Sequence, residues 1–119
     1  MDPHNEKIHG ANWTEWNLLK QAKPRFPGHL QPNIPLWGYE MDNDPEVMAK
    51  KIDAAADNGV DHFIFDWYWY NETGGTFQDG ALEDGFLKAP NRHRLEFSLM
   101  WASQTWMNVH PAVGPTGSD

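Results

Sequence analysis

The sequence predicts an α/β fold built on a parallel sheet, and three observations support this prediction. A helical pattern over residues 45–58 is followed at once by an aromatic and β-branched run, Val60–Tyr70. A weaker helical pattern over Asp79–Lys88 then precedes a second apolar run, Leu95–Trp101. Alternating helices and strands with short connections are typical of parallel sheets whose strands are joined by crossover helices.

The helix at 45–58 has clear start and stop signals. Asp44 is a good N-cap, Pro45 suits the first helical position, and Gly59 follows as a C-terminal stop. Apolar side chains recur at helical spacing between these signals, at Val47, Met48, Ile52, Ala55 and Ala56.

The run Val60–Tyr70 is too short and too crowded for an amphipathic helix and lacks clean alternation, so it is expected to be a strand covered on both faces. The segment Asn71–Gly80 is polar and Gly-rich and predicts a loop. The helix after it contains Gly85 and ends before Pro90.

The chain is expected to form a single domain, 1–119. Prolines and glycines interrupt residues 1–44, where we expect irregular structure with one short helix over Trp13–Ala22. Residues 45–107 hold the helix–strand–helix–strand unit, and 108–119 form a loop tail. Because two strands are too few for such a sheet, either strands are missing or the chain is a fragment.

Composition excludes several classes of function. The 119 residues carry 9 Lys and Arg against 17 Asp and Glu, a net charge of −8, which argues against nucleic-acid binding. No apolar run is long enough to span a bilayer, and no signal peptide is visible, so the compartment stays unknown. With no Cys and no metal-ligand spacing among the six His, we expect neither a metal nor a cofactor.

Both predicted strands end in clusters of aromatic and polar residues, and ligands bind at the carboxyl ends of parallel strands. Indole rings there suit the C–H face of a sugar, while Asp, Asn and Gln bind its hydroxyls. The alternative is that these aromatic residues are core. Asp66, inside an apolar run, is either functional or held by a structural hydrogen bond. Glu15, between Trp13 and Trp16, either contacts a ligand or caps a helix.

The order of motifs resembles the glycoside hydrolase family 99-like domain, which includes the WbsX-type proteins of polysaccharide gene clusters, often labelled glycosyltransferases. The resemblance covers about residues 5–108. It rests on Trp13-Thr14-Glu15-Trp16, on Phe26-Pro27-Gly28-His29 with Gln31-Pro32, on Asp44-Pro45-Glu46-Val47, on the aromatic strand Phe63–Asn71, and on Leu99-Met100-Trp101-Ala102.

This resemblance implies a partial (β/α)8 TIM barrel, its N-terminal portion, lacking the first strand and the C-terminal strands that carry the paired catalytic carboxylates. The fragment would contribute sugar-binding residues and would be inactive alone. No catalytic residue is assigned in it. The implied partner is a carbohydrate, such as a glycan containing α-mannosides. The expected substrate-binding residues are Trp13, Glu15, Trp16, Asp66, Trp67, Tyr68, Trp69, Trp101, Gln104 and Trp106.

Two alternatives remain: a non-catalytic module that binds a glycan or a protein, and a polysaccharide-biosynthesis protein of the WbsX glycosyltransferase type. Because a piece of a barrel exposes strand edges and inward-facing aromatic rings, we expect the isolated chain to self-associate.

Overall fold

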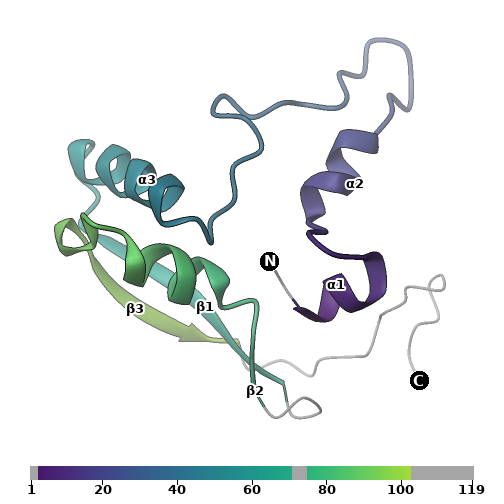
Figure 1. Cartoon of the computed structure of the whole chain (residues 1–119). Coiled ribbons are helices and arrows are strands. Elements are labelled where there is room, and N and C mark those ends of the chain that lie inside the picture. Colours follow the sequence, from purple (N-terminus) through teal and green to yellow (C-terminus); the bar gives the residue numbers. More distant parts are fainter. Residues whose placement is uncertain (1–2, 71–74, 103–119) are drawn as a thin grey trace. The chain divides into compact units, whose positions relative to one another are not determined.

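The computed structural model describes residues 3–70 and 75–102. The chain forms two compact units, Met1–Met41 and Asp42–Asp119, and each is described by itself. The observed class is mixed α/β. Helices α1 (Pro3–His9), α2 (Glu15–Gln21) and α3 (Pro45–Asp57) accompany strands β1 (His62–Tyr70), β2 (Gly75–Phe77) and β3 (Glu96–Trp101) in the described residues (Figure 1).

Helix α3 confirms the strongest sequence prediction and begins as expected. The Asp44 carboxylate accepts a hydrogen bond from the backbone N–H of Glu46 at 2.9 Å, and Pro45 occupies the first turn. At the other end, Gly59 adopts a φ of +84°, a conformation that favours glycine, and lets the chain turn towards β1.

The three strands pair in the order β2-β1-β3. The pair β1–β3 is parallel, with register from His62 opposite Glu96 to Trp67 opposite Trp101, which confirms the predicted parallel pair. The pair β1–β2 is antiparallel and places Trp69 opposite Thr76.

Two predicted loop regions contain regular structure. The loop expected at Asn71–Gly80 includes β2, and the irregular region expected at the start of the chain includes α1. A three-residue strand has too few residues for a period-2 pattern, and its pairing with β1 supplies the order. The second predicted helix is also different, because it consists of a π-helical turn η1 (Ala81–Gly85) followed by a 3₁₀ turn η2 (Phe86–Lys88).

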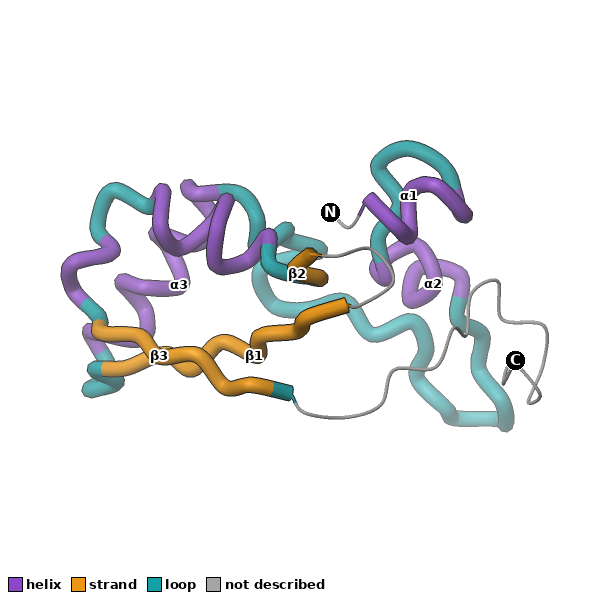
Figure 2. The backbone as a smooth tube through the Cα atoms, turned by 90° about the horizontal axis from the view of Figure 1, so that it is seen from below, coloured by secondary structure: helices purple, strands orange, loops and turns teal. Residues whose placement is uncertain are grey.

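The core lies between the sheet and the helical elements α3, η1 and η2, which lie on one side of β1 and β3 (Figure 2). Ile52 and Phe86 are fully buried, and Phe63 and Phe65 of β1 pack against them. The other face of the sheet is open in the described residues, where Ile64 is 65 % exposed. The expectation that β1 is covered on both faces is therefore wrong for this part of the chain.

Gly85 allows a close approach of two segments. A Cβ at this position would lie 2.0 Å from the carbonyl oxygen of Asp42 and 3.3 Å from the Met48 methyl group. No side chain fits there without moving backbone. The glycine that weakens the helical pattern in the sequence therefore has a packing role.

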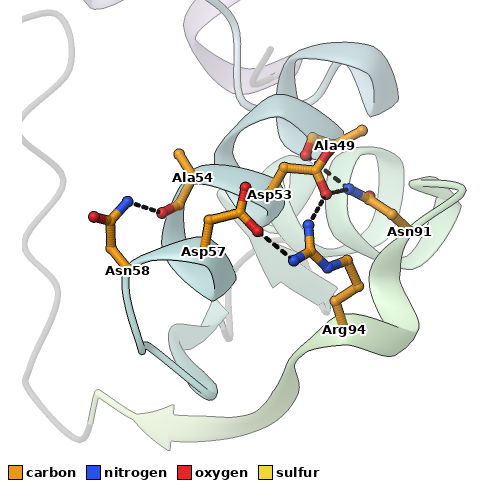
Figure 3. A network of polar contacts seen from close by, with 7 residues as sticks. All are labelled: Ala49, Asp53, Ala54, Asp57, Asn58, Asn91 and Arg94. Atoms are coloured by element: carbon orange, nitrogen blue, oxygen red, sulfur yellow. Dashed lines mark hydrogen bonds and ion pairs between the residues drawn. The ribbon is translucent and has the colours of Figure 1, made fainter.

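A polar network attaches the segment before β3 to helix α3 (Figure 3). Arg94, in the 3₁₀ turn η3 (Arg92–Arg94), forms ion pairs with Asp53 and with Asp57, one turn further along α3. The amide of Asn91 donates to the Ala49 carbonyl at 2.9 Å and to Asp53. These hydrogen bonds to Arg94 and Asn91 hold the pKa of the exposed Asp53 carboxyl below its usual value.

Candidate functional site

Alternation along β1 divides its side chains between the two faces of the sheet. The Phe65 ring lies 5.3 Å from that of Phe86 and 6.3 Å from that of Phe97, so these residues belong to the face covered by the helices. On the other face, the His62 ring nitrogen lies 2.9 Å from the Ser98 hydroxyl. Odd-numbered residues of both strands therefore face the helices, and even-numbered residues face the open side.

Three tryptophans gather where β1 and β3 end. The Trp67 ring lies 5.0 Å from the Trp101 ring, its partner in the parallel register, and 6.0 Å from the Trp69 ring. Beyond this pair, the backbone N–H of Ala102 donates to the Trp67 carbonyl at 3.1 Å. Trp69 and Trp101 are 45 % and 65 % exposed, although indoles bury a large apolar surface when they can. We call Trp67, Trp69 and Trp101 the tryptophan cluster.

The carboxylate and the phenol next to this cluster contact each other. The Tyr68 hydroxyl donates to the Asp66 carboxylate at 3.1 Å, and Asp66 is exposed. Burial and the neighbouring Asp66 carboxylate both raise the pKa of Tyr68, so its hydroxyl keeps its proton at neutral pH. One alternative for Asp66 in the sequence analysis was a structural hydrogen bond, and the donor observed is the Tyr68 hydroxyl.

The His62–Ser98 pair is a polar contact that the sequence analysis did not identify. The two residues are 36 positions apart, and only the parallel register of β1 and β3 brings them together. The pair lies at the start of β1, four residues before Asp66 and therefore about 13 Å along the strand. No sequence motif marks it.

In the unit Met1–Met41, the predicted residues Trp13 and Trp16 make local contacts. Trp13 stacks on the His9 ring at 4.3 Å. The Trp16 indole N–H donates to the Glu40 carbonyl at 2.9 Å, and its ring lies 5.2 Å from that of Tyr39. Glu15 occupies the first position of α2, and the preceding Thr14 makes no side-chain capping bond.

Comparison with known proteins identifies the family. The family model described as glycosyltransferase WbsX matches residues 1–113. The chain belongs to the WbsX glycosyltransferase family.

Similar proteins include two named uncharacterized protein WxcX, from Xanthomonas campestris pv. campestris strain B100 and strain ATCC 33913. Each is 31 % identical to this chain over 106 residues, which are 87 % of the chain and 14 % of the relative. The WbsX-family chain thus spans about a seventh of the length of these curated relatives. No solved structure matches it.

The described residues of this WbsX-family chain place five of the ten predicted site residues at one end of the sheet, divided between its two faces. Asp66 and Tyr68 lie on the open face, and the tryptophan cluster lies on the other face at the same end of β1 and β3. Trp13, Glu15 and Trp16 belong to the other compact unit, and Gln104 and Trp106 lie outside the described residues. Within residues 3–70 and 75–102, no group of three acidic or His side chains is arranged to hold a metal ion.

Within the same residues, no helix is long and apolar enough to cross a membrane.

Proposed function

We propose that this chain supplies sugar-contacting residues to a carbohydrate-active protein, and that the contacts are made where β1 and β3 end. The observation that supports the proposal best is the parallel pair itself, because its register sets Trp67 beside Trp101 at 5.0 Å, with Asp66 one residue earlier on the opposite face of the same strand end. Ligands of parallel α/β proteins bind at this end of the strands. Membership of a family described as a glycosyltransferase supports a carbohydrate ligand.

The chemistry of this region fits a sugar ring. Exposed indoles offer flat apolar surfaces to the C–H face of a pyranose, and they keep an N–H donor at the edge. A carboxylate held by a neighbouring hydroxyl accepts strong hydrogen bonds from sugar hydroxyls. The substrate-binding residues proposed here are Asp66, Trp67, Tyr68, Trp69 and Trp101, together with Trp13, Glu15, Trp16, Gln104 and Trp106 from the sequence analysis.

We further propose that the sheet is part of a (β/α)8 barrel similar to that of family 99-like glycoside hydrolases. In a doubly wound open sheet both faces are covered by helices and the strands are apolar on both faces. The open face of β1 and β3 instead carries His62, Asp66 and Ser98 among its side chains. The same face also carries Ile64 and Met100, which are exposed in the described residues. A face that further strands, pairing beyond β3, would enclose is what the proposed barrel requires.

For the complete protein, the proposed reaction is hydrolysis of a glycan, such as one containing α-mannosides. Glycoside hydrolysis requires two carboxyl groups on either side of the scissile bond, and no catalytic residue is assigned in this chain. The second candidate is glycosyl transfer from an activated sugar, which the family description favours. The chain alone would then be inactive, and β3, which lies at the edge of the sheet in the described residues, would promote self-association.

The test is calorimetric titration of the natural protein containing this chain with neutral mannose and glucose oligosaccharides. Saturable binding that Trp101→Ala weakens at least tenfold is expected, because this variant removes one indole from the tryptophan cluster. Leu99→Ala is the matched control, since Leu99 lies on the same face of β3 one side-chain repeat earlier and is also exposed. Equal affinity in both variants would contradict the proposal.

A parallel titration with nucleoside diphosphate sugars separates the two candidate reactions. Transfer from an activated donor predicts that such a sugar binds, and that oligosaccharide length increases in its presence. Hydrolysis predicts release of shorter oligosaccharides without a donor.

A further inference from the structure

The electrostatics around the proposed sugar site restrict what it can bind. Asp66 is exposed on the open face of the sheet, and the Tyr68 hydroxyl that holds it is uncharged. Because Tyr68 donates its proton to Asp66, it does not neutralise the negative charge. The remaining lone pairs of this carboxylate are acceptors only, so they select hydrogen-bond donors on a ligand.

The cations of the second unit lie elsewhere. Five Lys and Arg residues lie between Asp42 and Ala102, and all belong to helical elements: Lys50, Lys51, Lys88, Arg92 and Arg94. These elements lie on the other side of the sheet, or, in the case of η3, are hydrogen-bonded to α3. Three of them form ion pairs with carboxylates, Lys51 with Asp42, Lys88 with Asp84, and Arg94 with Asp53 and Asp57.

The other titratable groups described on the open face do not compensate for Asp66. His62 and Glu96 are partners in the register at the opposite end of the strands, about 13 Å from Asp66. That distance exceeds the Debye length of about 8 Å at physiological ionic strength, so neither group strongly affects a ligand at Asp66. Among the described residues of β1 and β3, the charge that a ligand meets at this end of the open face is therefore that of Asp66.

We infer that the site at the ends of β1 and β3 takes neutral or amino sugars and rejects acidic ones, with Asp66 as the residue that sets this specificity. This inference rests on the proposed function. A neutral pyranose presents hydroxyl donors to Asp66. A uronic acid bound in the same place brings a second carboxylate to within about 5 Å, where repulsion in a partly exposed site corresponds to about a five- to tenfold loss of affinity.

The experiment compares calorimetric Kd values for matched disaccharides. Two are neutral, one built from glucose and one from mannose, and the other two are built from the corresponding uronic acids. It uses the natural protein, its Asp66→Asn variant and two controls. Asn keeps an acceptor oxygen for the Tyr68 hydroxyl and removes only the charge. Glu83→Gln removes the same charge from the exposed turn η1, and Tyr68→Phe removes the hydroxyl while keeping Asp66 charged.

In the natural protein the neutral sugars are expected to bind about five- to tenfold more tightly than the uronic acids. Asp66→Asn should reduce this ratio to about twofold or less, mainly by tightening uronate binding. Glu83→Gln and Tyr68→Phe should preserve the ratio. Raising the salt concentration should also reduce it in the natural protein, because screening weakens the repulsion, and this measurement needs no variant.

Uronic acids that bind as tightly as neutral sugars, or a ratio that Asp66→Asn leaves unchanged, would overturn the inference while leaving sugar binding intact. Binding of neither class would overturn the proposed function and the inference together. The two failures are therefore distinguishable.

Discussion

The two faces of the β1–β3 sheet differ in composition although the same strands supply both. The face under α3, η1 and η2 carries Phe63, Phe65 and Phe97, whose rings pack against the buried Phe86 ring. The open face alternates with it and carries the His62–Ser98 pair and the Asp66–Tyr68 pair. The difference shows that an apparently uniform aromatic run encodes two surfaces, one that joins the core and one that carries polar pairs and is open in the described residues.

The largest expected effect is on the face under the helices. Phe86→Ala should lower the free energy of unfolding by about 3–5 kcal/mol, because the ring is fully buried and contacts Phe63, Phe65 and Phe97. Urea denaturation followed by circular dichroism measures the loss. Val60→Ala, at a residue 44 % exposed, should cost less than about 1 kcal/mol. Similar losses for both variants would show that the core lies elsewhere.

On the open face, Ile64→Ala tests whether further strands cover this side of the sheet. The side chain is 65 % exposed in the described residues, and an exposed isoleucine is expected to cost less than about 1 kcal/mol when it is truncated. The proposed barrel instead predicts about 2–4 kcal/mol in the natural protein, because Ile64 would then lie inside it. A small loss in that protein would contradict the barrel.

The close approach at Gly85 gives the next prediction. Gly85→Ala should cost about 1–3 kcal/mol, since the new Cβ would lie 2.0 Å from the Asp42 carbonyl oxygen and backbone must move. Gly75→Ala is the matched control, because no atom of the described residues, apart from the chain neighbours of Gly75, lies within 4 Å of a Cβ added there. Thermal unfolding of the two variants should show a clearly lower Tm only for Gly85→Ala.

The smallest effect concerns the exposed Arg94 network, and it depends on pH. The pKa of Asp53 is lowered from 3.8 in the folded protein, so its contribution is present above pH 3.8 and is lost as pH falls through the lower folded value. Arg94→Ala should therefore reduce stability slightly at pH 7 and progressively less below pH 3.8. Urea denaturation across this range measures the difference. A constant difference at every pH would exclude the Asp53 pairing as its cause.

Much of the second unit could be predicted from the sequence because its signals are local. Asp44 and Pro45 start α3, and the aromatic run Val60–Tyr70 contains β1, as expected. Strand β2 and the π-helical turn η1 could not be predicted in this way. Strand β2 is ordered by its pairing with β1, and the turn η1 is accompanied by close packing of Gly85 against the Asp42 backbone. Both are tertiary contacts, which a local sequence pattern does not reveal.

For the candidate site, the sequence indicated the end of the strands but not the faces. A period of two separates Asp66 from Trp67, yet the sequence alone does not say which face the helices cover. The register that sets Trp67 beside Trp101, and Asp66 on the side opposite α3, depends on residues more than 30 positions apart. The same dependence explains why the His62–Ser98 pair was missed.

The most direct test of the central claim is an NMR titration of the natural protein, selectively labelled with ¹⁵N-tryptophan, with a neutral oligosaccharide. Assignment uses single Trp→Phe variants. The account predicts saturable shifts in the indole N–H signals of Trp67, Trp69 and Trp101, with the signal of Trp37 unchanged. Saturable sugar binding that leaves all three cluster signals in place would contradict it.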